Sequence, residues 1–422
     1  MKKIILILLI NVFIFGDSFL ISDIPLPRTY IMDLDPYDCN EECLREYLRN
    51  DMIFSFLATT TFKKDINDEY IKEAKNIYIS ILNLSSTIHT DKLKIAMLLP
   101  YKKIGKYATS TTNAVFAYLL ARNYTFELKS FKIESESKED IKKALEEIKN
   151  DGFLHVIAPL TIKGALNLTS LSPELAVWFP TINKKDISSS SKNIYFGAID
   201  YEEQSKELLK EASNKLVIFY DKSYMGQKLK NLQEEIFLTN SLDFDTLLTK
   251  PKDYNNKKII KFSIASRTTN LERELKNNLN IIDSSVFLDT PLVKSGMIMS
   301  QLTLYDINTT NKLSTQINYD PLIFSITQYK DRKNMIIANS ITKQNNVFIQ
   351  ANALLSNDIK YDWINYTTTV GIDMFFSDIT SLPREYKIPI VENQAIYPIE
   401  LKEPAYSKFK NHHRKLREEI IY

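Results

Sequence analysis

The sequence predicts an α/β protein of two lobes, with parallel sheets flanked by helices and an N-terminal helical extension. The first observation is the run 93–100, which is almost entirely apolar and stops at a proline. Such a run is typical of a parallel strand buried on both faces. Two further observations are the alternation of strand-like and helix-like segments after Asp91 and its renewal after the serine-rich break 188–191. Strands alternating with helices indicate βαβ units.

The N-terminus has the features of a secretory signal. Two lysines precede an apolar run of about a dozen residues, and small residues follow at Gly16 and Ser18. The run is short for a membrane span. We therefore expect a signal peptide at 1–18, cleaved after Ser18 or Gly16, and a periplasmic protein without a transmembrane segment in its mature chain.

Residues 19–91 are expected to form a helical hairpin. Apolar side chains recur at helical spacing over 41–57 and again over 66–84. The chain has only two cysteines, Cys39 and Cys43, and export favours a disulfide between them, although two free thiols are the alternative. Because a bond across one turn of a continuous helix would be strained, Cys39 should lie outside the helix, with Asn40 or Glu41 at its start.

The first lobe is predicted from four strands and the helices between them. Ser137 should cap the helix that carries Ile141 and Ile148, with Asp140 three residues after the cap. Another helix should begin at Thr109 and end near Arg122. The strands are expected at 93–99, 125–133, 153–160 and 177–182.

A second cycle of strands and helices follows the strand 194–200. Asp200 is a plausible N-cap, with glutamates in the next turn where the helix dipole favours them. Strands are expected at 215–221, 285–289 and 312–317. We assign 92–199 plus 320–345 to the first lobe, 200–319 plus 346–405 to the second lobe, and 406–422 to a charged tail.

Composition excludes several classes of function. The formal charge is +2 with mixed signs, so no whole-protein field favours nucleic acid. The sequence has 8 glycines and no phosphate-binding glycine motif. Four histidines show no zinc-site spacing, and no nucleophile elbow occurs. We expect no enzyme activity, no metal and no cofactor.

The order of elements resembles the type I periplasmic-binding-protein fold, in particular penicillin-binding-protein activators and receptor-type solute-binding proteins. The resemblance covers 91–401. It is carried by five segments, which are 94–100, 153–160, 197–204, 221–226 and Tyr319-Asp320. The family's fold implies that any ligand lies in a cleft between the lobes, against the carboxyl ends of the strands.

The candidate residues of that cleft carry hydroxyl, carboxyl or aromatic groups. They are Thr109, Ser110, Thr111, Thr161, Asp200, Tyr201 and Tyr224. Hydroxyls at a helix N-terminus suit an anionic group, although ordinary capping is the alternative. The loop 101–107 carries Lys102, Lys103 and Lys106 where solute binders have a glycine- and serine-rich loop. Burying three ammonium groups against a neutral solute would be costly.

The sequence therefore leads to the hypothesis of a non-catalytic exported protein that docks onto a cell-envelope protein, with regulation of peptidoglycan synthesis as one role of such docking. On this hypothesis amino acids, sugars and peptides give no thermal shift. The alternatives are a solute-binding receptor for a transporter and a structural component of an envelope machine such as the flagellar motor. Asn308 lies in an N-x-[ST] sequon with Asp306 two residues before it, so it is a glycosylation candidate.

Overall fold

The computed structural model describes residues 39–62, 66–81, 92–122, 124–187, 191–239 and 257–413. The expected signal peptide lies outside the described residues, as do most of the charged tail and the serines 188–190. Within the described part, no helix is long and apolar enough to cross a membrane.

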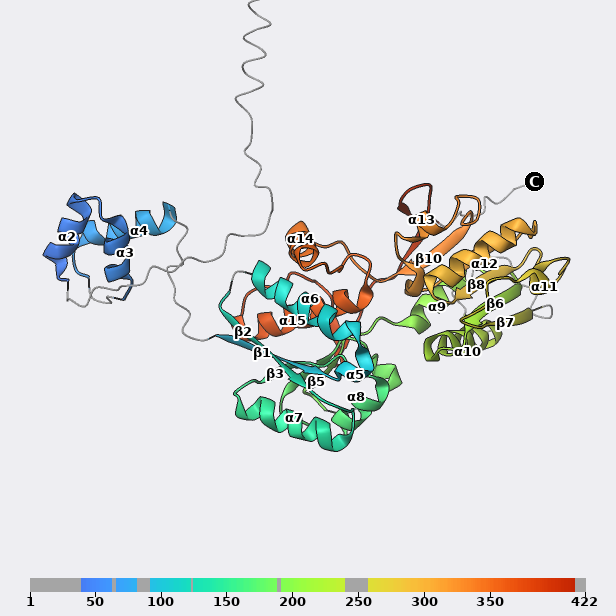
Figure 1. Cartoon of the computed structure of the whole chain (residues 1–422), viewed down its shortest axis with the longest axis horizontal. Coiled ribbons are helices and arrows are strands. Elements are labelled where there is room, and N and C mark those ends of the chain that lie inside the picture. Colours follow the sequence, from blue (N-terminus) through green and yellow to red (C-terminus); the bar gives the residue numbers. More distant parts are fainter. Residues whose placement is uncertain are drawn as a thin grey trace, which may run out of the picture.

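Two seven-stranded sheets form two lobes, which Figure 1 shows side by side. The first sheet has the order β11-β12-β5-β4-β3-β1-β2, and the second has β14-β13-β10-β9-β8-β6-β7. In each sheet five neighbouring strands run parallel. At one edge of the first sheet β12 lies parallel to β5 and β11 antiparallel to β12, while in the second sheet β13 and β14 are each antiparallel to their neighbour. The predicted two-lobed α/β fold is confirmed.

The first lobe is built around β1, as its apolar run predicted. Its strands are β1 (Leu93–Leu99), β2 (Phe126–Lys132), β3 (His155–Ile157), β4 (Ala176–Phe179), β5 (Ile194–Phe196), β11 (Ile390–Val391) and β12 (Gln394–Ala395). Its helices are α5 (Tyr101–Ile104), α6 (Lys106–Ala121), α7 (Lys138–Asn150), α8 (Ile162–Thr169), α14 (Asn346–Leu354) and α15 (Trp363–Thr380), with the 3-10 turn η1 (Lys184–Asp186). Ser137 caps α7 by accepting the Asp140 N–H, as predicted.

The second lobe repeats this connectivity. Its strands are β6 (Lys215–Asp221), β7 (Lys258–Ile264), β8 (Ser285–Asp289), β9 (Asn311–Ser314), β10 (Met335–Asn339), β13 (Glu400–Pro404) and β14 (Phe409–Asn411). Its helices are α9 (Tyr201–Leu209), α10 (Tyr224–Thr239), α11 (Glu272–Leu275), α12 (Leu292–Leu304) and α13 (Ile323–Ile326), with the 3-10 turn η3 (Gln316–Asn318).

The predicted boundaries between the lobes need correction. Residues 320–345 were assigned to the first lobe, but β10 lies in the second sheet between β9 and β13. Residues 346–395, assigned to the second lobe, provide α14, α15 and two strands of the first. The strands predicted from the sequence do not include the apolar run 335–338, which ends at a polar asparagine. The predicted second lobe therefore lacks its fifth parallel strand. The connections therefore lie at 197–200, 340–345 and 396–399.

The N-terminal extension contains three helices where a hairpin was expected. They are α2 (Glu41–Arg49), α3 (Ile53–Phe62) and α4 (Glu69–Ile81), which form the separate group at the left of Figure 1. The expected first helix is interrupted because Asp51 adopts a positive φ of 53°. As a result Met52, expected on the buried stripe, is 45% exposed. The group has its own apolar core around Leu44, Phe56 and Ile71.

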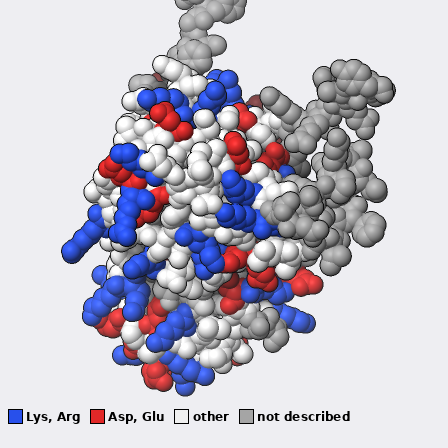
Figure 2. Space-filling model, turned by 90° about the vertical axis from the view of Figure 1, so that its right-hand side faces the viewer, with Lys and Arg blue, Asp and Glu red and all other residues white. Residues whose placement is uncertain are grey.

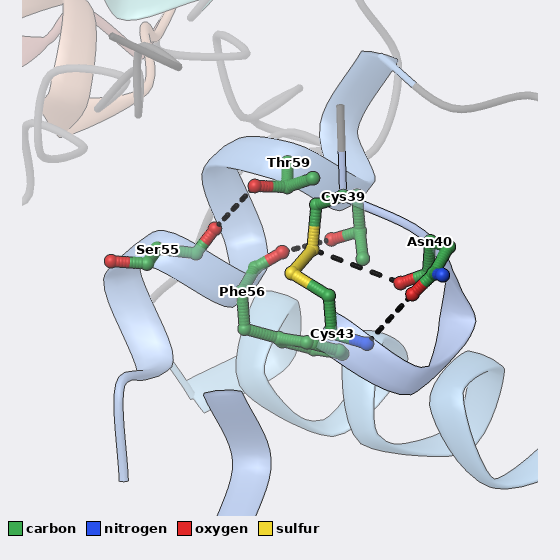
Figure 3. Close-up of a disulfide and its surroundings, with 7 residues drawn as sticks. Cys39, Asn40, Cys43, Ser55, Phe56 and Thr59 are labelled. Carbon is green, nitrogen blue, oxygen red and sulfur yellow. Dashed lines mark hydrogen bonds between the residues drawn. A yellow bond between two sulfur atoms is a disulfide. The ribbon is translucent and has the colours of Figure 1, made fainter. Parts of the chain in front are cut away.

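The two cysteines are joined by a disulfide at the start of this group (Figure 3). The Cα atoms of Cys39 and Cys43 are 5.4 Å apart. Cys39 lies outside α2, whose N-cap Asn40 accepts the Cys43 N–H at 3.0 Å. The chain can therefore bend at Asn40 and bring the two sulfurs together without distorting the helix.

Candidate functional site

The two lobes meet at the carboxyl ends of their sheets, and we call the residues in contact there the inter-lobe boundary. Asp186, in the loop after β4, forms an ion pair with Lys228 of α10 at 2.5 Å. Tyr361, just before α15, contacts the ring of Tyr319 in the second lobe, with centroids 5.4 Å apart. Parallel α/β sheets place ligand-binding loops at these strand ends. The candidate site is therefore sought here.

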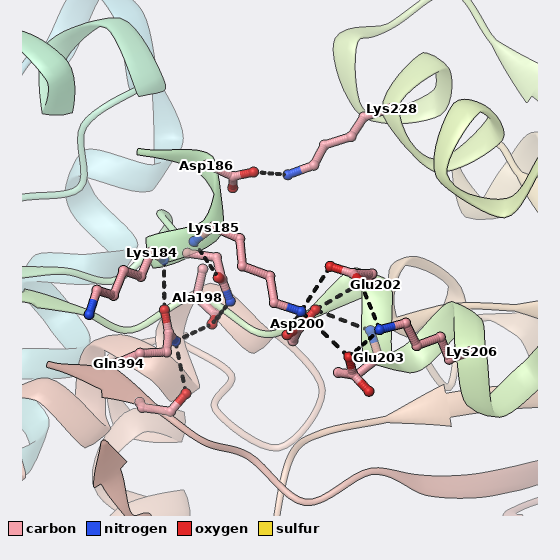
Figure 4. A network of polar contacts seen from close by, with 12 residues as sticks. Lys184, Lys185, Asp186, Ala198, Asp200, Glu202, Glu203, Lys206, Lys228 and Gln394 are labelled. Carbon is pink, nitrogen blue, oxygen red and sulfur yellow. Dashed lines mark hydrogen bonds and ion pairs between the residues drawn. The ribbon is translucent and has the colours of Figure 1, made fainter. Parts of the chain in front are cut away.

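A charged network joins the lobes at the first connection (Figure 4). The amine of Lys185 lies 2.9 Å from Asp200, 2.8 Å from Glu202 and 3.5 Å from Glu203. Partial burial alone would lower the pKa of Lys185, but the hydrogen-bonded carboxylates outweigh it and hold that pKa above its ordinary value. The lysine thus links the first lobe to the beginning of α9.

Uncharged side chains fasten the connections to one another. The carbonyl of Ala198 accepts hydrogen bonds from Asn183 at 3.3 Å and from Gln394 at 3.2 Å. The hydroxyl of Tyr397 donates to the carbonyl of Gly197 at 2.8 Å. The first and third connections are therefore tied together, and Figure 4 shows Ala198 and Gln394 beside the charged network. Bonding to one shared segment confines any motion between the lobes to a few neighbouring residues.

Aromatic side chains gather where α9 enters the second lobe. Tyr201 is 6% exposed, and its ring meets that of Trp363 edge-on at 6.1 Å. Burial raises the pKa of Tyr201, and nearby Tyr107 and Asp362 add to the rise. Asp362 caps α15, and burial raises its pKa against the opposing bonds from backbone N–H groups. We call Tyr107, Tyr201, Asp362 and Trp363 the aromatic corner.

The predicted cleft residues have different surroundings from those expected. α6 begins at Lys106, so Thr109, Ser110 and Thr111 lie inside the helix rather than at its start. The Thr111 hydroxyl bonds back to the Tyr107 carbonyl at 2.6 Å. Hydroxyls in helix interiors commonly do this. The first turn that an anion would meet is therefore not formed by these three residues.

Thr161 caps α8, but a neighbouring carboxylate already occupies that helix start. Glu136 is 4% exposed, accepts the Thr161 N–H at 2.7 Å and also bonds the Thr161 hydroxyl. Gly164 makes room for it, since a Cβ there would come within 2.6 Å of the glutamate. An internal anion thus satisfies the donors that an anionic ligand would use.

Asp200 and Tyr224 occupy the second-lobe side of the boundary. Asp200 is the N-cap of α9, as predicted, and accepts the N–H groups of Glu202 and Glu203. Tyr224 opens α10 and is 64% exposed, so its ring remains accessible. Of the predicted residues, Asp200 and Tyr201 are brought together by the first connection.

The lysines of the segment 101–107 do not crowd this boundary. The segment forms the short helix α5 and a glycine turn. Lys102, 73% exposed, pairs with Glu134, which follows β2 in the same lobe. Lys103 and Lys106 are also exposed, so no ammonium group of the three is buried. The electrostatic objection to a bound solute therefore does not hold.

Sequence reasoning missed Lys185, Asp362 and Trp363. Lys185 follows β4 as Thr161 follows β3, which is the signal that was available. A pocket of about 580 Å³ lies elsewhere, against the connections 340–345 and 396–399, and none of the predicted cleft residues lines it. Among the described residues, no group of three histidine, cysteine, aspartate or glutamate side chains is arranged to hold a metal.

No protein-family model and no curated protein matches the sequence. Solved structures do resemble it. A branched-chain amino acid ABC transporter protein from Rhodospirillum rubrum has a TM-score of 0.57 at 8% identity, over 76% of this chain and 100% of that one. The branched-chain amino acid transporter substrate-binding protein of Streptococcus pneumoniae, in complex with isoleucine, has a TM-score of 0.52 at 10% identity, over 76% and 98%.

A third similar structure is a solute-binding protein of an ABC transporter from R. palustris, in complex with benzoate. Its TM-score is 0.50 at 11% identity, over 76% of this chain and 95% of that one. These similarities establish the fold. All three are to proteins of transporters, so the docking hypothesis is wrong as the leading interpretation. The specific resemblance to penicillin-binding-protein activators is not supported. The chain has the two-lobed fold of type I periplasmic binding proteins.

Proposed function

We propose that this protein is a non-catalytic receptor that binds a small organic solute between its lobes and presents it to a membrane transporter. The observation that carries the proposal is the pair of α/β lobes whose carboxyl edges meet at a shared boundary with three connections. Solute-binding proteins from three bacteria share this architecture. The lysines of α5 are exposed, so they place no buried ammonium group against a solute.

The chemistry of the boundary suggests how a solute is held. Tyr224 supplies an exposed ring from the second lobe, and the aromatic corner supplies rings and the carboxyl of Asp362, which lies just before α15 in the first lobe. Rings and a few placed polar groups are the usual lining of a small-molecule site. Because Glu136 already neutralises the start of α8, a ligand carboxylate would find its donors elsewhere. An apolar or aromatic body with an amino group suits this set best.

Several expectations from the sequence belong with this proposal. The signal peptide at 1–18 would deliver the chain to the periplasm, and the partner would be the membrane part of a transporter. Thr109, Ser110 and Thr111 remain candidates only if a solute contacts the side of α6 on which they lie. Asn308 is exposed, in the loop between α12 and β9, where a glycan could be attached without disturbing either sheet.

A thermal-shift screen of the purified chain tests the proposal. Leucine, isoleucine, phenylalanine and benzoate are the first solutes, because neighbours of this fold bind that class. A ligand at 100 times its Kd should add about 2.7 kcal/mol to the free energy of unfolding. Calorimetric titration should then give a single site.

Matched variants make the result specific. Tyr224→Ala should weaken binding of the solute found, while Tyr406→Ala, which removes another exposed ring outside the boundary, should not. The proposal fails if a broad panel of amino acids and aromatic acids produces no shift. It also fails if both variants bind as the parent does.

A further inference from the structure

The second lobe contains a group of buried polar side chains that the solute site does not use. It consists of Ser205 on α9, Gln233 on α10, Asp289 at the end of β8 and Thr315 just after β9, and we call it the polar pocket of the second lobe. The first, second and fourth are fully buried and Asp289 is 1% exposed. Each has one side-chain oxygen without a hydrogen-bond partner within the described part of the chain.

The topology places these four residues in one locality. The amide of Gln233 donates to the Asp289 carboxylate at 2.9 Å. β8 and β9 are parallel neighbours, and the register that pairs Phe287 with Leu313 sets Asp289 opposite Thr315 on the same face. α9 and α10 pack against each other over that face.

Ser205 is brought to the same place by its neighbour in α9. The side-chain oxygen of Gln204 accepts the N–H of Gln316 at 2.9 Å, next to Thr315. The four free oxygens therefore belong to residues in adjoining positions on α9, α10 and the ends of β8 and β9, and none of them bonds to another.

The charge of this group is unbalanced. Asp289 forms no ion pair within the described residues, and the charge that lies near it is the like charge of Asp221. A buried carboxylate without a counter-charge is costly, so it must either carry a proton or be neutralised by a cation. Burial raises the pKa of Asp289 to about 8, because a buried carboxylate without a counter-charge is unfavourable in its negative form.

We infer that the polar pocket binds one small monovalent cation, of the sodium class, through the free oxygens of Asp289, Gln233, Ser205 and Thr315. Four oxygens with a single negative charge suit a hard monovalent ion, while a divalent ion prefers more carboxylates or an octahedral set. In the part of the chain that the structure describes, no three histidine, cysteine, aspartate or glutamate side chains are grouped to hold a metal, which agrees with a site that carries only one carboxylate. The ion would fasten α9 and α10 to the strands beside the first connection.

The test uses the purified full chain without solute. Melting temperature is measured in sodium, potassium and choline chloride at equal ionic strength, at pH 6 and pH 9. Sodium or potassium should raise it saturably over choline by about 5 °C. The rise should be larger at pH 9, because protons compete less for the carboxylate. Line broadening of the ²³Na resonance should report the same affinity.

Two variants and a control complete the experiment. Asp289→Asn should abolish the cation-specific rise, and Thr315→Val should weaken the apparent affinity about tenfold. Asp306→Asn, at an exposed position with a positive φ that asparagine also accepts, should retain it. Equal melting temperatures in all three salts would overturn the inference in favour of a protonated Asp289. So would a cation effect that survives Asp289→Asn.

Discussion

The two lobes share one strand order but bury different chemistry. At the centre of the first sheet, the Trp178 ring packs against two glycines, Gly197 and Gly371, and its indole N–H donates to the Thr367 carbonyl at 3.1 Å. In the second sheet the side chains buried at the ends of β8 and β9 are instead the polar Asp289 and Thr315. The comparison shows that the strand order specifies the path of the backbone but does not specify whether the buried side chains are apolar or polar. The first lobe should therefore respond to side-chain volume and the second to charge.

Gly371→Ala should give the largest effect. A Cβ at this position would lie 2.4 Å from the Trp178 ring, which is held from both sides. Overpacking of this kind should cost about 3 kcal/mol, measured by urea unfolding. Gly296→Ala is the control in the second lobe, because its Cβ would meet its nearest neighbours, the flexible end of Ile326 and the Thr327 methyl, at the longer distances of 3.0 and 3.3 Å. Equal losses for the two variants would remove the distinction between the lobes.

Lys312→Met should show that the second lobe responds to charge. Lys312 is buried in β9, and burial lowers its pKa to about 8. The native state therefore loses this proton at lower pH than the unfolded chain does, so the parent gains stability as pH rises from about 8 to about 10.5. The Met variant lacks this gain. Its free energy of unfolding, relative to that of the parent, should therefore fall by about 2 kcal/mol over that range.

Denaturant unfolding of both proteins at pH 7, 8, 9 and 10 makes this measurement. The exposed Lys330→Met serves as the control and should follow the parent. Parallel curves for the parent and Lys312→Met would show that the ammonium group is already solvated. The buried amine would then not distinguish the second lobe from the first.

The smallest effect concerns the contact between the lobes. A double-mutant cycle with Asp186→Asn and Lys228→Gln should give a coupling energy of about 1 kcal/mol or less, because both side chains are partly exposed. The coupling should fall in 1 M salt. A coupling near zero in low salt would show that this ion pair does not help to hold the lobes together.

Local signals in the sequence predicted much of the fold. The apolar run of β1 and the caps at Ser137 and Asp200 depend on neighbouring residues, and the structure has them where expected. The assignment of 346–395 failed because lobe membership depends on pairing over long range: Gln394 pairs with Phe196 across nearly two hundred residues. No local pattern encodes such a pairing.

The candidate site was predicted less well than the fold. Asp200 and Tyr201 follow directly from the first connection, so sequence order was enough to bring them together. The partners Asp362 and Trp363 reach them only because α15 folds back onto the first lobe. The role of Glu136 depends on a contact with Thr161, 25 positions away, that only the packed structure reveals.

The three connections also determine the order in which the protein can be completed during synthesis. When residue 339 has emerged, the second lobe already has all five of its parallel strands. The first lobe, although begun earlier, still lacks α14, α15 and β12, and the face of β1 with Ile95 and Met97 has α6 over it but not yet α15. The lobe that is made first is thus finished after most of the other. Throughout that interval its incompletely covered apolar surface is open to aggregation.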